Sequence, residues 1–93
     1  MTTVTLKAKL DLPGVNSLKE KRRIIKSIMA RLKNKFNISI SEVEAQDSHR
    51  TAVIGAAIVS NDAAFGNSVL SKVVSHLELS RDAVLLDYTI ETY

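Results

Sequence analysis

Apolar and polar residues alternate along residues 3–12 of this chain. Every second position from Val4 to Leu12 is apolar, whereas threonine, lysine and aspartate occupy the positions between them. A period of two predicts a β-strand with one buried face. Pro13 and Gly14 end this strand, because proline lacks a backbone donor and glycine permits a sharp turn.

Residues 17–36, SLKEKRRIIKSIMARLKNKF, change to a helical period. Ser17 and Glu20 have the spacing of a capping box, which predicts that the helix begins at this serine. The apolar side chains that recur at helical spacing form the expected buried stripe: Leu18, Ile25, Ile28, Met29, Leu32 and Phe36.

Residues 37–45 and 51–60 predict two further strands. In the first of them the apolar parity changes, so we expect a bulge near Ser41-Glu42 or, alternatively, a strand that leaves the core. The second is apolar on both faces. A polar connection of hairpin length, residues 46–49, joins the two.

A second helix and a last strand complete the pattern. Candidate N-caps precede the helix at residues 60–62, and its expected inward row is Phe65, Val69, Val73 and Leu77. The strand begins near Ala83, and one face is expected to carry Val84, Leu86, Tyr88 and Ile90.

The order β-α-β-β-α-β predicts a ferredoxin-like α+β sandwich. Right-handed crossovers place both helices on one face of a four-stranded antiparallel sheet, with the first and third strands in its centre. Ninety-three residues are enough for a single domain, residues 1–93. Without cysteine there is no disulfide and no thiolate metal site. The N-terminus alternates instead of forming a signal peptide, so we expect a cytoplasmic protein.

Charge is concentrated in residues 17–36, which hold eight of the thirteen basic residues and one acid. At about 100° per residue, four or five of these cations form one stripe on the helix surface: Lys19, Arg22, Lys26 and Lys33, with Arg23 at its edge. Like charges at i+3 and i+4 cost about 0.2–0.5 kcal/mol each, and cations in the first turns oppose the helix dipole. This pattern favours a site for a phosphate backbone; the alternative is a solvated charged face.

The sheet face away from the helices is expected to show an apolar row from the third strand. It consists of Val53, Gly55, Ala57 and Val59. We expect a second copy of the chain to cover this row as a homodimer, although small residues also tolerate water. None of the four aromatic residues lies on the first or third strand, which excludes base stacking of the RNA-recognition-motif kind.

Catalytic and metal-binding patterns are weak in this sequence. His49 and His76 are far apart in the chain, and we expect solvent-exposed side chains and no metal site. Acylphosphatase resembles the predicted architecture, and Arg22 and Asn61 stand loosely where its catalytic pair would be sought. The loop DLPGVNSLKEK, however, lacks a glycine-rich phosphate cradle. We therefore expect no catalysis and no cofactor.

The segments SLKEKRR at 17–23, KFNISISEVEAQD at 35–47 and AVIGAAIVSND at 52–62 resemble the YlxP-like bacterial family of unknown function (DUF503 type). The resemblance covers nearly the whole chain and implies a ferredoxin-like fold and a dimer. Members are often encoded beside translation initiation factor two and ribosome-binding factor A, which implies a role near the ribosome. His49 stands where the family pattern has tryptophan.

Three functions are consistent with these patterns. The first is a non-enzymatic binding protein that contacts RNA or the ribosome through the basic stripe. The second is a protein-interaction or assembly module that acts through the outer sheet face. The third is a small-ligand-sensing domain. No membrane partner is expected, because the other face of the basic helix is needed for the core.

Overall fold

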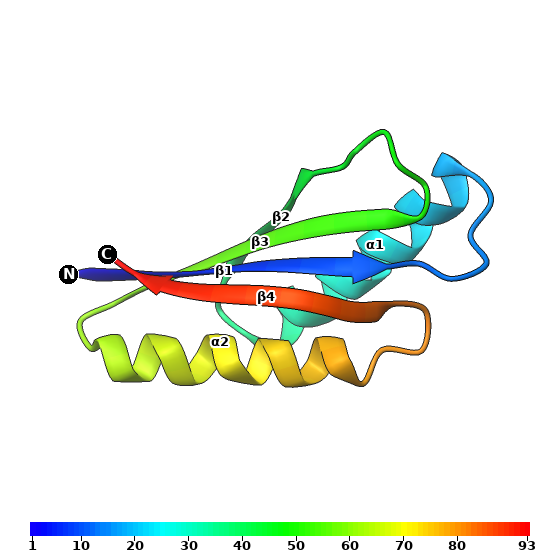
Figure 1. Ribbon diagram of the computed structural model, residues 1–93. Coiled ribbons are helices and arrows are strands. Elements are labelled where there is room, and N and C mark those ends of the chain that lie inside the picture. The colour runs from blue at the N-terminus through cyan, green and yellow to red at the C-terminus, as the bar shows by residue number, and fades with distance from the viewer.

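The computed structural model describes all residues 1–93 and has six regular elements (Figure 1). In chain order these are β1 (Thr2–Asp11), α1 (Leu18–Lys35), β2 (Ser39–Glu44), β3 (Thr51–Ser60), α2 (Ala63–Glu78) and β4 (Val84–Thr92). The expected β-α-β-β-α-β order is confirmed. Neither helix combines the length and apolarity that a membrane crossing requires.

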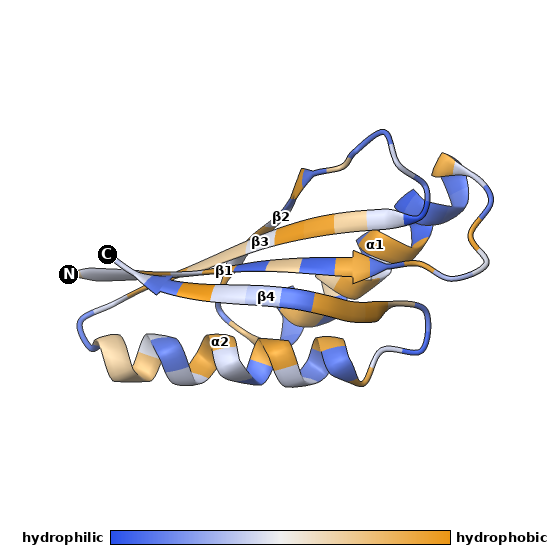
Figure 2. Cartoon of the chain, in the orientation of Figure 1, coloured by the Kyte–Doolittle hydropathy of each residue, from blue (hydrophilic) through white to orange (hydrophobic).

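The four strands form one antiparallel sheet in the order β2-β3-β1-β4, so the expected central strands are also confirmed. The strict alternation along β1 is visible as bands of hydrophobic and hydrophilic residues in Figure 2. Val4, Leu6, Ala8 and Leu10 face the helices and are buried, whereas Lys7 and Lys9 point to the opposite, outer face.

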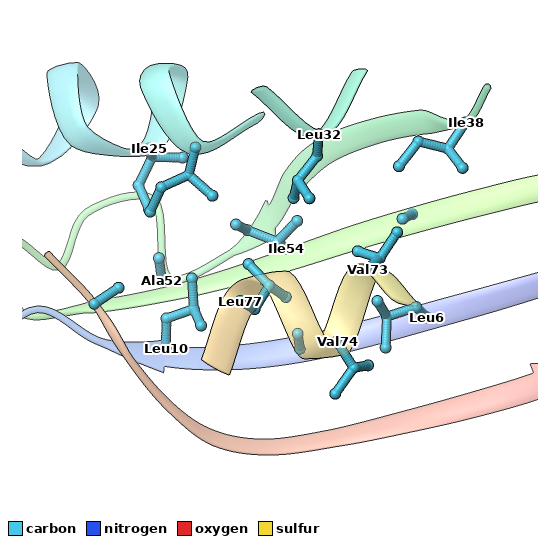
Figure 3. Packing of buried hydrophobic residues seen from close by; sticks show 14 of the residues in the cluster. Leu6, Leu10, Ile25, Leu32, Ile38, Ala52, Ile54, Val73, Val74 and Leu77 are labelled. Carbon is cyan, nitrogen blue, oxygen red and sulfur yellow. The ribbon is translucent and has the colours of Figure 1, made fainter. Parts of the chain in front are cut away.

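Both helices pack their apolar sides against the same face of the sheet. Figure 3 shows Ile54 of β3 between Leu32 of α1 and Leu77 of α2, and all three belong to the same cluster. Twenty buried residues form this single continuous cluster. Each large aliphatic side chain fully buried there stabilises the fold by about 1.5–3 kcal/mol, so packing alone can hold α1 in a fixed orientation.

Two bulges set the direction of side chains on the edge strands. The pairing of β2 with β3 shifts between Glu42 and Glu44, which places a bulge at Val43, next to the expected position. The pairing of β1 with β4 also shifts, and the extra residue is Leu86. The expected face of the last strand is confirmed for Tyr88 and Ile90, which pair with Ala8 and Leu6. It was wrong before the bulge, because Leu85, not Leu86, shares the helix-facing side with Ile90.

The buried face of α2 differs from the expected row at its first turn. Phe65 is exposed, and Gly66 is buried in its place. A Cβ atom on Gly66 would lie 2.8 Å from a methyl carbon of Val4. The helix approaches β1 so closely here that only glycine fits, which is why the aromatic side chain lies outside the core.

Candidate nucleic-acid interface

The basic stripe lies on the side of α1 that faces away from the sheet. All five of its members are exposed: Lys19, Arg22, Arg23, Lys26 and Lys33. The structure contains two ion pairs, Lys7–Glu44 and Lys21–Glu42, and neither involves the stripe. No acidic group therefore lies within 4.0 Å of these cations, and their charge is available to a ligand.

The start of α1 is fixed by Ser17, as the sequence predicts. Its hydroxyl oxygen accepts a hydrogen bond from the Glu20 backbone N–H at 3.1 Å. The reciprocal bond from the Glu20 side chain, which a complete capping box would add, is not formed. One capping bond typically stabilises a helix by about 1 kcal/mol. The helix therefore begins at a defined residue, and the side of the helix on which the stripe lies is fixed.

Lys21 is the one basic residue of this segment that is not at the surface. Its side chain is only 1% exposed, and its ammonium lies 2.8 Å from the Glu42 carboxylate of β2. The same ammonium donates hydrogen bonds to the backbone carbonyls of Ala45, at 2.7 Å, and Ser48, at 2.5 Å. The contact with Glu42 is an ion pair between opposite charges, and the carboxylate oxygen that makes it, Oε2, is itself buried.

Sequence reasoning missed the role of Lys21, although a signal was present. Lys21 stands seven residues before Ile28 and eleven before Leu32, so it occupies the middle of the apolar arc of the helix. A lysine at such a position predicts a buried ammonium with a dedicated carboxylate. Seven of the eight cations in residues 17–36 remain at the surface.

The connection between β2 and β3 folds around the Lys21 ammonium. The Ser48 backbone N–H donates to the Ala45 carbonyl, and the Ser48 hydroxyl accepts from the backbone N–H groups of Arg50 and Thr51. Ala45 adopts a positive φ of 61°, which is rare for a residue with a Cβ atom. The loop at residues 45–50 therefore lies beside the first turns of α1 in a fixed conformation (Figure 1).

The outer sheet face is less open than the sequence predicts. The row Val53, Gly55, Ala57 and Val59 does point outward, in register with Lys9, Lys7, Thr5 and Thr3 of β1. Val53 is nevertheless only 7% exposed, and the side chain of Val43 covers Gly55. The expectation of a bare row was therefore wrong for these two positions. The bulge in β2 sets the Val43 side chain against Gly55, and Glu44 is the pairing partner of Val53. Val59 remains 62% exposed.

Charged groups surround this row. Lys7 of β1 pairs with Glu44 of β2 across it, and Asp87 and Glu91 of β4 lie on the same face. Beyond β4, the Tyr93 hydroxyl donates a hydrogen bond to the Glu91 carboxylate at 3.0 Å. This bond, together with the negative charge of Glu91, raises the pKa of Tyr93 above its usual value of 10.0.

The two histidines lie in different environments. His49 is exposed in the loop at residues 45–50, as expected. His76 is half-buried, and its ring packs edge-on against Phe36 with 5.3 Å between ring centroids, so the expectation of solvent exposure was wrong here. With Arg31 and Ser80, His76 also lines a small cleft of about 160 Å³ between the two helices.

Comparison with solved structures places the chain in the ferredoxin-like class. A de novo designed protein with ferredoxin fold covers the whole chain and 84% of its own length, with a TM-score of 0.50 and 18% identity. The oxygenase SnoaB from Streptomyces nogalater, described as cofactor-independent, matches 98% of this chain and 90% of its own, with a TM-score of 0.55 and 15% identity. At these identities the likeness shows the fold alone.

Sequence comparison then gives the family. Residues 3–90 match the family model described as a protein of unknown function, DUF503. The uncharacterized protein YlxP of Bacillus subtilis (strain 168) is 41% identical over 71 residues, which are 76% of this chain and 67% of that protein. The chain belongs to the DUF503 family, and the resemblance seen in the sequence is confirmed.

Proposed function

We propose that this protein is a non-enzymatic binding protein that contacts RNA, free or in the ribosome, through the basic stripe of α1. The observation behind this function is the set of five exposed, unpaired cations on one side of a helix whose other side is anchored in the core. Binding here needs no cofactor and no metal, since the ligand is held by charge and shape.

The dimensions of α1 suit a nucleic-acid backbone. Eighteen helical residues span roughly 27 Å, and the stripe runs from the first turn, at Lys19, to the last, at Lys33. Cations spread over this length can meet several successive phosphates, whereas a small anion needs a compact cluster. Charge–phosphate contacts position the ligand and carry no sequence information by themselves.

A second candidate function is assembly through the outer sheet face. Three exposed valines support it, because Val43, Val59 and Val84 lie on that face. A second copy of the chain would cover them and form the homodimer expected from the sequence. This face would be the working surface of an interaction module, and the stripe would then be a solvated face.

Charge reversal separates the two functions. Replacement of Arg22, Lys26 and Lys33 by glutamate should abolish RNA binding at about 50 mM salt without lowering the melting temperature. A matched control carries the same change of charge at three exposed cations outside the stripe, Arg31, Lys72 and Arg81. Equal loss of binding in both variants would show that net charge, not the stripe, attracts RNA.

A further inference from the structure

Lys21 makes more polar contacts than a role in stability alone would require. Its ammonium, with three donor hydrogens, meets the Glu42 carboxylate and the carbonyls of Ala45 and Ser48. Buried ion pairs add little stability relative to an apolar replacement of the same volume, because desolvation offsets the attraction. What this arrangement does supply is a single conformation for the loop that carries the two carbonyls.

The backbone of that loop is held from both sides, whereas its side chains are free. Besides the bonds around Ser48, the Arg50 carbonyl accepts a hydrogen bond from the Leu12 N–H at 2.8 Å. Four residues with polar, exposed side chains project from this frame. These are Gln46, Asp47, His49 and Arg50, and none makes a side-chain hydrogen bond or ion pair within the chain. A rigid loop that displays unpaired polar groups is typical of a recognition element.

The position of the loop links it to the basic stripe. Lys21, which binds the loop, is the immediate neighbour of Arg22 on α1. The loop and the start of the stripe therefore lie at the same end of α1, on different sides of the helix, and a ligand that extends past the first turn at Lys19 could meet both. Figure 2 shows hydrophilic residues both in the first turns of α1 and in this hairpin.

The chemistry of the loop fits nucleotides that are not base-paired. An exposed imidazole such as His49 can stack on an unstacked base, and Arg50 can stack or bind phosphate. Gln46 and Asp47 offer the amide and carboxylate groups that hydrogen-bond base edges. Side chains cannot read base edges in the deep major groove of an RNA duplex, and sequence-specific recognition of RNA mostly targets unpaired bases, so this set of groups suits splayed-out bases best.

We propose that the loop at residues 45–50, positioned by Lys21, recognises unpaired nucleotides next to an RNA helix held by the basic stripe. This deepens the proposed function and rests on it. His49 would make the stacking contact, and Lys21 would act as a positioning residue that never touches RNA. The ligand would be a structured RNA with a bulge or an open loop, not a continuous duplex.

The test compares two RNA probes by fluorescence anisotropy: a blunt duplex, and the same duplex with a three-nucleotide bulge. Stacking of one base is worth about 1–3 kcal/mol, which corresponds to a preference of at least fivefold for the bulged RNA. His49→Ala should remove this preference and leave duplex affinity unchanged. Asn61→Ala, in the exposed loop at the other end of β3, is the matched control and should keep it.

Lys21 is tested by the double variant Lys21→Met/Glu42→Ala, which leaves no buried charge without a partner. This variant should bind the duplex as the wild type does and lose the preference for the bulged RNA. Destabilisation alone would lower the affinity for both probes and would not change the ratio of the two affinities. If this variant fails to fold, His49→Ala decides the matter. Equal affinity of the wild type for both probes would overturn the role of the loop and leave stripe binding intact. Binding to neither probe would overturn both.

Discussion

Replacement of Lys21 by methionine should destabilise the protein by about 3 kcal/mol or more. Methionine fills much of the space of the lysine stem, but it leaves the Glu42 carboxylate and two carbonyls without their donor. Loss of one member of a buried pair costs about 3–5 kcal/mol. The Glu42 side chain is 19% exposed, and partial hydration places the expected loss at the lower end of this range.

That loss is large against the whole stability of a chain of this size. At about 0.05–0.15 kcal/mol per residue, 93 residues have a free energy of unfolding of about 5–14 kcal/mol. The control is Lys26→Met, the same chemical change at an exposed position of the same helix, which should alter stability by less than about 0.5 kcal/mol. Urea unfolding followed by circular dichroism measures both values.

A double-mutant cycle tests the pairing itself. Glu42→Ala alone leaves a buried ammonium without its carboxylate and should also be destabilising. The double variant Lys21→Met/Glu42→Ala should lose less than the sum of the single losses, with a coupling energy of about 0.5–3 kcal/mol. Strict additivity, or a loss for Lys21→Met no greater than that for Lys26→Met, would refute a buried Lys21–Glu42 pair.

Three further predictions concern other parts of the molecule. Gly66→Ala should destabilise the protein by up to about 2 kcal/mol in thermal unfolding. A Cβ atom 2.8 Å from a methyl carbon of Val4 costs about 1–3 kcal/mol, and the better helix propensity of alanine offsets about 1 kcal/mol of this cost. A higher melting temperature in the variant would contradict the prediction. Glu91→Gln should lower the pKa of Tyr93 toward 10 in a tyrosinate absorbance titration. Because the phenol pKa is raised in the folded protein, the hydrogen bond to Glu91 contributes stability at pH values below the ordinary tyrosine pKa. This contribution is lost as the pH rises through the raised pKa. An unchanged Tyr93 titration in the Glu91→Gln variant would contradict the prediction. Sedimentation at micromolar concentration should show a wild-type dimer and a Val59→Lys monomer, and a monomeric wild type would rule out the homodimer.

The fold follows from patterns that are local in the sequence. The alternation from Val4 to Leu12 predicts β1 and its buried face, and Ser17 predicts the start of α1. The order of elements then leaves one simple topology, because crossovers are right-handed. Each of these features depends on period and capping, which need no knowledge of distant contacts.

Features that depend on a distant partner could not be predicted in the same way. The bulge at Leu86 is defined by its register with β1, and Phe65 lies outside the core because Gly66 meets Val4. Gly55 is covered by Val43, whose position depends on the bulge in β2. The five cations of the stripe were predicted correctly as exposed, whereas the burial of Lys21 depends on Glu42, 21 residues further along the chain.

The salt dependence of RNA binding tests the proposed interface most directly. Four or five phosphate contacts on a duplex predict that log K falls with log salt concentration with a slope between about −3.6 and −4.5. Titration of the wild type with the blunt RNA duplex over a salt series gives this slope, and the Arg22, Lys26 and Lys33 to glutamate variant should show no measurable binding at the lowest salt. A slope near zero, or an unchanged slope in that variant, would contradict an RNA interface on α1.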